Sequence, residues 1–168
     1  MNNRARRASH AAIIASLYAV LTHMQNLVLP GSATWAIQFR CSEALCVLAF
    51  FTPAAVPGLT LGCLLFNITY SGALPLDLVV GSLATFLAAA GMRQLKKRLP
   101  KWYLLPGLLL PAVTNGILVG WELTVYIGGG FLLNAVYVAI GEAAALLTLG
   151  AVVHHIVLHR RLDRWLLS

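Results

Sequence analysis

Long apolar runs separated by short polar segments dominate the sequence. A helix needs about 20 residues to cross the hydrocarbon core of a bilayer, and the apolar runs predict six membrane-spanning helices. Their approximate ranges are 8–29, 43–54, 57–70, 76–95, 103–122 and 131–159. The first run ends at Pro30-Gly31, a helix-terminating pair, and no small-residue cleavage site follows it, so we interpret it as a retained span rather than a signal peptide. The pattern predicts an all-α membrane protein with one integral membrane domain, residues 1–168.

Residues 32–42 depart from the helical pattern. Apolar residues alternate there with smaller or polar ones, at Trp35, Ile37 and Phe39, which predicts an extended segment. The next two helices, at about 12 to 16 residues each, reach only roughly 18 to 24 Å, less than the ~30 Å of hydrocarbon. The extended segment must therefore dip inward, where irregular backbone is tolerated only if it is buried in protein or lines a water-filled cavity. We place Gln38, Arg40 and Glu43 at the wall or lid of an outward-facing cavity.

Composition and charge support a membrane protein and give its orientation. The chain is 60% hydrophobic and only 10% charged, which excludes an ordinary soluble domain. Its net charge of +7 does not indicate nucleic-acid binding, because eleven of the twelve basic residues form three clusters beside apolar runs: Arg4, Arg6 and Arg7; Arg93, Lys96, Lys97, Arg98 and Lys101; Arg160, Arg161 and Arg164. Such clusters mark the cytoplasmic face. Four crossings fit between the first two clusters and two between the last two, which predicts cytoplasmic N- and C-termini.

Several function classes lack their motifs. No Gly-x-x-x-x-Gly-Lys-[Ser/Thr] phosphate loop occurs, so ATP would be used by another polypeptide. The three cysteines, Cys41, Cys46 and Cys63, form no Cys-x-x-Cys pair. His154, His155 and His159 lie beside Arg160 and Arg161, where interfacial histidines are ordinary. We expect no cofactor, no metal and no catalytic residues.

The few ionisable residues away from the basic clusters are the candidates for ligand binding, since charges at membrane depth are costly. They are Arg40, Glu43, Asp77, Glu122 and Glu142. Glu142 lies roughly 16 Å along the last span, near mid-membrane, and Asn67 and Asn115 lie in the outer halves of their spans. Structural alternatives remain: an Arg40–Glu43 ion pair, a helix-dipole role for Asp77, solvation of Glu122 at an outer helix end, and interhelical hydrogen bonds from the asparagines.

A stripe of small residues follows the first span. Its members are Ala8, Ala11, Ala12, Ala15 and Ala19. Small residues four apart allow close approach of another helix, which is either a helix of this chain or one of a partner protein.

Several segments resemble one known family. They are Gln38-Phe-Arg-Cys-Ser-Glu43, Pro53-Ala-Ala-Val-Pro-Gly-Leu59, Gly62-Cys-Leu-Leu-Phe-Asn67, Asp77-Leu-Val-Val-Gly-Ser-Leu-Ala-Thr85, Pro111-Ala-Val-Thr-Asn-Gly116 and Val138-Ala-Ile-Gly-Glu142. Across nearly the whole chain the sequence resembles the QueT family, the queuosine-precursor-binding S components of energy-coupling factor (ECF) transporters. The resemblance implies an S-component bundle of six helices in a prokaryotic cell membrane. It also implies a transmembrane coupling subunit and two ATPase subunits as partners, with the small-residue stripe as the docking face.

The resemblance further implies capture of a 7-deazaguanine from outside the cell, such as 7-aminomethyl-7-deazaguanine (preQ1), queuine or queuosine. A carboxylate can accept the paired N–H groups of the guanine-like edge, so we expect Glu142 or Glu43 to bind that edge. Gln38, Arg40, Asn67 and Asn115 would assist, and Asp77 or Glu122 would bind a cationic substituent. Trp35, Trp121, Tyr126 or Tyr137 would stack on the base. An S component for another vitamin, a stand-alone facilitator or secondary transporter, and a small membrane enzyme remain alternatives.

Overall fold

The computed structural model describes residues 3–32 and 38–162, and every regular element in those ranges is helical. The helices, in chain order, are α1 (Asn3–Val28), η1 (Cys41–Phe50), α2 (Ala55–Thr69), α3 (Asp77–Arg98), α4 (Leu104–Ile127), α5 (Phe131–Ala145), η2 (Leu146–Gly150) and α6 (Ala151–His159). η1 is a 3₁₀-helix and η2 is a π-helical turn that joins α5 to α6. The predicted all-α fold is confirmed.

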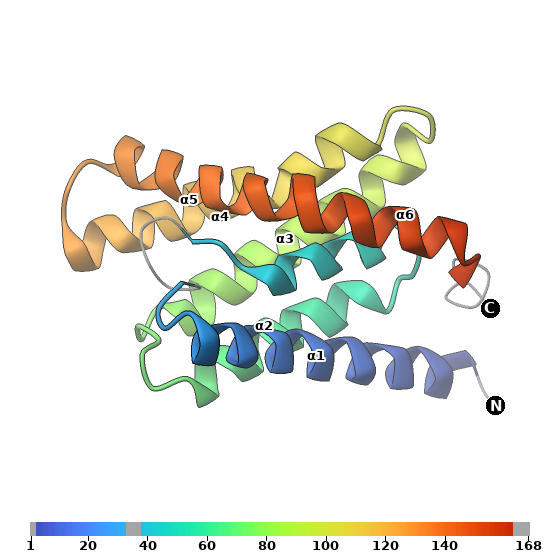
Figure 1. Ribbon diagram of the computed structural model, residues 1–168, viewed down its shortest axis with the longest axis horizontal. Coiled ribbons are helices and arrows are strands. Elements are labelled where there is room, and N and C mark those ends of the chain that lie inside the picture. Colours follow the sequence, from blue (N-terminus) through green and yellow to red (C-terminus); the bar gives the residue numbers. More distant parts are fainter. Residues whose placement is uncertain (1–2, 33–37, 163–168) are drawn as a thin grey trace.

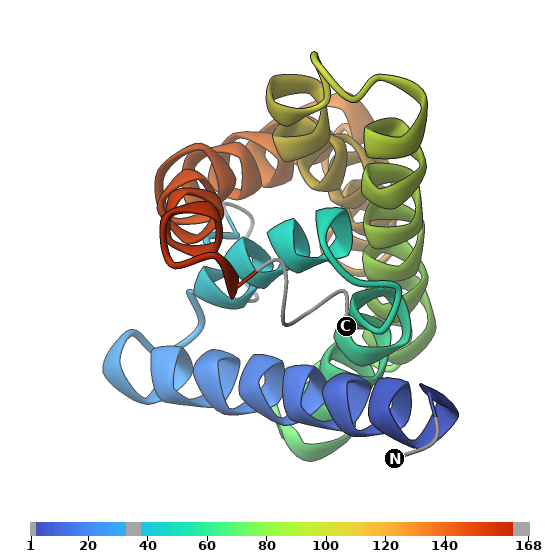
Figure 2. The ribbon, with the colours of Figure 1, turned by 90° about the vertical axis from the view of Figure 1, so that its right-hand side faces the viewer.

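The helices run roughly along one long axis and surround η1. The N-terminal end of α1, the C-terminal end of α6 and the connection between α3 and α4 lie at one end of the molecule (Figure 1). Viewed from that end, the other helices form a ring around the central η1 (Figure 2). η1 contacts each of them. The surrounding helices therefore fix the position of η1 and of the residues at its N-terminal end.

Four helical units are long and apolar enough to cross a membrane: α1, α3, α4 and the continuous unit Phe131–His159. η1 and α2 are apolar but shorter. The 10 residues of η1 reach about 20 Å at the 3₁₀ rise, and the 15 residues of α2 reach about 22 Å. The expectation of two short helices after the extended segment is confirmed, whereas the count of six crossings stays a prediction.

Glycines on α2 let it pack closely on α1. A Cβ added to Gly58 would lie 2.9 Å from the carbonyl oxygen of Ala11, and one added to Gly62 would lie 2.9 Å from that of Ala15. Ala11 and Ala15 are accordingly buried. Part of the small-residue stripe thus packs within the chain, and its other members, Ala8 and Ala12, are exposed while Ala19 is partly exposed.

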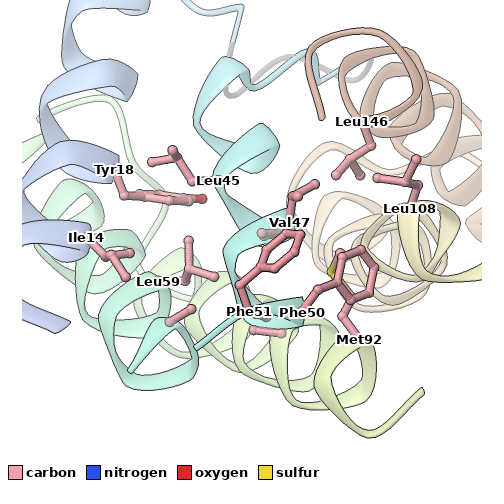
Figure 3. Packing of buried hydrophobic residues seen from close by; sticks show 14 of the residues in the cluster. Ile14, Tyr18, Leu45, Val47, Phe50, Phe51, Leu59, Met92, Leu108 and Leu146 are labelled. Carbon is pink, nitrogen blue, oxygen red and sulfur yellow. The ribbon is translucent and has the colours of Figure 1, made fainter. Parts of the chain in front are cut away.

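The apolar core is built mainly around η1. Leu45, Val47, Phe50 and Phe51 project from η1 and the residue that follows it toward the surrounding helices (Figure 3). They meet partners on both sides of the molecule: Ile14, Tyr18, Leu59, Met92, Leu108 and Leu146. Large apolar side chains on the outer faces, such as Leu27, Ile117 and Leu132, are more than half exposed. Exposed apolar side chains of this kind suit a protein whose outer surface faces lipid.

Candidate functional site

Eight of the polar residues singled out from the sequence are buried, each 8% exposed or less. We call them the polar cluster: Gln38, Arg40, Glu43, Asn67, Asp77, Asn115, Glu122 and Glu142. They come from the segment before η1, from η1 itself and from α2, α3, α4 and α5. Four of the five acidic residues of the chain, and the one arginine outside the three basic clusters, therefore lie inside the bundle.

Electrostatic contacts connect the charged members of the polar cluster. Arg40 interacts with both Glu43 and Glu142, and those two carboxylates interact with each other. Glu122 on α4 interacts with Asp77 at the start of α3 and with Arg40. One buried guanidinium therefore lies among four acidic side chains, so acidic groups outnumber basic ones in the polar cluster.

Gly141 brings the segment before η1 into this position. A Cβ at Gly141 would lie 2.5 Å from the carbonyl oxygen of Gln38 and 3.0 Å from its nitrogen. Only a glycine allows the backbone of Gln38 to lie against α5 at this distance. Arg40 has an extended backbone conformation, and Gln38 and Arg40 are buried in the protein; the depth of this segment in the membrane stays a prediction.

Three residues of α1 hold this segment and the first turn of η1 from the other side. We call Tyr18, Thr22 and Gln25 the α1 ladder. Tyr18 Oη donates to Glu43 Oε1 at 2.5 Å, and Thr22 Oγ1 donates to Ser42 Oγ at 2.7 Å. Gln25 Nε2 donates to Ser32 Oγ and to the carbonyl of Phe39, and Gln25 Oε1 accepts from the Cys41 N–H at 2.7 Å. The Gln25 amide thus fixes the backbone on both sides of Arg40.

Sequence reasoning missed the α1 ladder. Its signal is present, because polar residues recur on one face of an otherwise apolar span at positions 18, 22 and 25. The partners of these residues follow only from the tertiary fold.

Some members of the polar cluster already have hydrogen-bond partners within the chain. Both carboxylate oxygens of Glu43 accept hydrogen bonds, one from Tyr18 and the other from Cys46 Sγ at 3.0 Å. Asp77 Oδ2 accepts from the Leu74 N–H at 2.7 Å, and Asn67 Nδ2 donates to the Asp77 carbonyl at 2.6 Å. These contacts explain Glu43, Asn67 and Asp77 at least partly as structural residues.

Other members are buried without such partners. Within the described ranges, no hydrogen-bond partner exists for Gln38 Oε1, both amide atoms of Asn115, or the four carboxylate oxygens of Glu122 and Glu142. Leaving a buried polar atom unsatisfied costs about 1–3 kcal/mol, and more when it is charged. These atoms are therefore the members of the polar cluster that contacts within the described chain explain least.

The length of α4 corrects one expectation about Glu122. Glu122 was expected at an outer helix end, but α4 continues to Ile127 and Glu122 is fully buried, so solvation does not explain it. Asn115, which follows Pro111 by one turn, is also fully buried. The two residues are seven apart and share one face of α4.

Of the aromatic residues expected to stack on the base, the three that the structure describes are more exposed than the polar cluster. Tyr126 and Tyr137 are 41% and 38% exposed, and Trp121 is 50% exposed, unlike the members of the polar cluster. Trp35 lies outside the described residues. Stacking on a ligand by any of them stays a prediction. Across residues 3–32 and 38–162, no three His, Cys, Asp or Glu side chains are arranged to hold a metal ion.

Long apolar helices around a buried polar cluster define the class of multi-pass membrane proteins with polar side chains in the interior of the bundle. The sequence profile of the QueT transporter family matches residues 8–159, and the chain belongs to that family. It is similar to a protein described as the queuosine precursor transporter QueT of Lactococcus lactis subsp. cremoris (strain MG1363), with 36% identity over 76 residues. That match covers 45% of this chain and 43% of the relative. No solved structure matches the chain.

Proposed function

We propose that the protein is the substrate-binding S component of an ECF-type importer and captures a 7-deazaguanine queuosine precursor. The observation that carries this proposal is the set of buried, unpartnered polar atoms of Gln38, Asn115, Glu122 and Glu142. Membership of a transporter family supports a transport role over an enzymatic one. The name of the Lactococcus relative supports the substrate class.

Glu142 is the carboxylate best suited to the guanine-like edge of the ligand. A deazaguanine presents a ring N–H beside an exocyclic amine, and one carboxylate accepts both. Glu142 is fully buried with both oxygens unpartnered, whereas both oxygens of Glu43 are occupied by Tyr18 and Cys46. Glu43 therefore serves as a fixed counter-charge for Arg40, and Asn115 or Gln38 bonds the remaining polar atoms of the base.

Glu122 is the corresponding candidate for a cationic substituent such as an aminomethyl group. Its two oxygens are unpartnered and it interacts with a second carboxylate, that of Asp77. Two neighbouring buried carboxylates favour a cation between them, because it offsets their mutual repulsion. Asp77 contributes its charge while its Oδ2 stays bonded to the Leu74 N–H.

The transport machinery would reside in partner proteins, a transmembrane coupling subunit and two ATPases. α1 offers a docking face, since Ala8, Ala12 and Ser16 are exposed at four-residue intervals. A groove of about 440 Å³ beside them is lined by Ala12, Ile13, Ser16, Leu17 and Val20. The basic clusters support an orientation with the N- and C-termini in the cytoplasm of a prokaryotic cell, in which the solute would reach the polar cluster from outside.

Thermal-shift and binding measurements on the purified full chain test the proposal. The ligand panel contains preQ1, queuine, queuosine and several vitamins of unrelated structure. We expect stabilisation by at least one deazaguanine and none by the vitamins. Stabilisation by a vitamin alone would instead identify an S component of different specificity.

Substitution of Glu142 tests the site. Glu142→Gln replaces an acceptor of the base edge with an amide that also carries donors, and we expect affinity for the deazaguanine to fall at least about tenfold. Arg40→Ala should also weaken binding, because it leaves the carboxylates without their counter-charge. Unchanged affinity in both variants would remove the proposed site.

A further inference from the structure

A second groove lies away from the polar cluster, near the end of α3 that leads into the α3–α4 connection (Figure 1). Its volume is about 210 Å³, and its lining residues are Phe50 of η1 and Arg93, Lys96 and Lys97 of α3. Spacings of three and four residues put the three cations on one face of the helix. Arg93 and Lys96 are only partly exposed, whereas Lys97 and Arg98 are exposed. Two of the three lining cations are thus partly covered by the protein, and Lys97 lies at the rim of the groove.

Aromatic rings hold part of this groove in a defined shape. Lys96 Nζ lies 4.0 Å from the centroid of the Phe51 ring and 5.1 Å from that of Tyr103. The Phe50 and Tyr103 rings pack edge to face at 4.8 Å. Since Lys96 is already ordered by these contacts, less side-chain entropy is lost when a ligand binds beside it.

Positive charge from a second helix converges on the same region. Arg93 interacts electrostatically with Arg7 of α1, and Arg7 lines a neighbouring groove together with Ala8, Ala11 and residues of the turn before α2. Because Arg7 and Arg93 repel each other, an anion bound at Arg93 would offset that repulsion. Arginine and lysine together suit a phosphate group, with arginine able to donate two parallel hydrogen bonds.

The surroundings favour a lipid as the source of that phosphate. The connection between α3 and α4 lies at this end of the long helices (Figure 1) and carries Trp102 and Leu99, which are 79% and 47% exposed. Exposed tryptophan beside basic residues is typical of the interface between headgroups and hydrocarbon.

We propose that the groove of Phe50, Arg93, Lys96 and Lys97 is a binding site for the headgroup of an anionic phospholipid. It is distinct from the substrate site and independent of the proposed function. In the orientation proposed above it faces the cytoplasmic leaflet, which is the anionic one. The lipid phosphate binds the cations of α3 that line the groove.

A general attraction of basic residues to the membrane makes a different prediction, which the chain itself allows to be tested. Arg98 and Lys101 belong to the same basic cluster but do not line the groove. The double variants Arg93→Gln/Lys97→Gln and Arg98→Gln/Lys101→Gln remove equal charge. Only the first removes groove cations.

The experiment measures thermal unfolding of the full chain in detergent with phosphatidylglycerol or with phosphatidylcholine of the same acyl chains. We expect phosphatidylglycerol to raise the midpoint by roughly 5 °C over phosphatidylcholine at saturation. The Arg93/Lys97 double variant should lose this difference and the Arg98/Lys101 double variant should keep it. Equal loss in both variants, or no difference in the unmodified protein, would overturn the proposal.

Two further measurements cover the remaining outcomes. Glycerol 3-phosphate without lipid should produce little stabilisation; if it reproduced the full shift, the groove would be a site for soluble phosphate and the lipid assignment would be wrong. If the Arg93/Lys97 variant does not fold, native mass spectrometry of the unmodified protein decides. Phosphatidylglycerol must remain bound at collision energies that remove phosphatidylcholine, and equal release of the two lipids contradicts the site.

Discussion

At the scale of single residues, the carboxylates of the polar cluster differ in how their oxygens are bonded. Glu43 accepts from Tyr18 and Cys46, and Asp77 accepts from a backbone N–H. Glu122 and Glu142 have no such bonds within the described ranges. The sequence could not distinguish the hydrogen-bonded acids from the others, because all four were selected for the same reason: each is an ionisable residue away from the basic clusters, in or beside an apolar span. The difference follows from which donors the fold brings to each side chain.

Glu122→Gln tests the role of the second carboxylate. If Glu122 binds a cationic substituent, the variant should lose about tenfold in affinity for preQ1. Its affinity for 7-cyano-7-deazaguanine, which is neutral at that position, should change little. Isothermal titration of both ligands gives the ratio. Equal losses for both would assign Glu122 to the base or to the fold, and retained preference for the cation would exclude it from the subsite.

At the scale of elements, two faces of α1 have different roles. One face carries the α1 ladder, which bonds the segment before η1 and the first turn of η1. Another face exposes Ala8, Ala12 and Ser16. The same helix therefore holds the segment that contains Arg40 and presents the proposed docking face. This arrangement assigns Gln25 as a positioning residue for the site, acting through the backbone on both sides of Arg40.

Gln25→Ala and Asn26→Ala form a matched pair for this role. Both side chains are amides at the end of α1 and both are 8% exposed. Asn26 bonds the Thr22 carbonyl and the Gly31 N–H, not residues 39–41. We expect each variant to lose about 1–2 kcal/mol of stability, while only Gln25→Ala also weakens ligand binding, about tenfold. Equal binding by the two variants, measured at a temperature where both are folded, would confine Gln25 to a structural role.

The helices also show which features of the fold could be predicted from the sequence. The range 131–159 was predicted as one span and the structure has a continuous helical unit with those bounds, because an apolar run of that length permits little else. The 3₁₀ geometry of η1 was not predicted, since composition does not distinguish hydrogen bonds to the third residue from those to the fourth. The buried candidates were found because charges in apolar runs are rare. Their hydrogen-bond partners on α1 were not, because those contacts join segments about 20 residues apart.

At the scale of the whole molecule, charge is separated along the long axis. The described acids lie in the polar cluster, whereas the α3–α4 connection and the free ends of α1 and α6, which carry the basic clusters, lie together at one end (Figure 1). Such separation orients a membrane protein. It also leaves the buried acidic side chains of the polar cluster away from that end, where the proposed solute would supply N–H donors or a cation.

A bulky residue on the exposed face of α1 tests whether transport depends on a partner. Ala12→Trp should leave deazaguanine binding by the isolated chain unchanged, because Ala12 lies outside the polar cluster. It should abolish ATP-dependent uptake when the chain is reconstituted in liposomes with a coupling subunit and two ATPases, because close helix approach needs small residues. Val113→Trp on α4, at a position that is 52% exposed, is the control and should transport normally. Uptake by the chain alone, without ATPases, would instead establish a facilitator, and normal uptake by Ala12→Trp would move the docking surface away from this face.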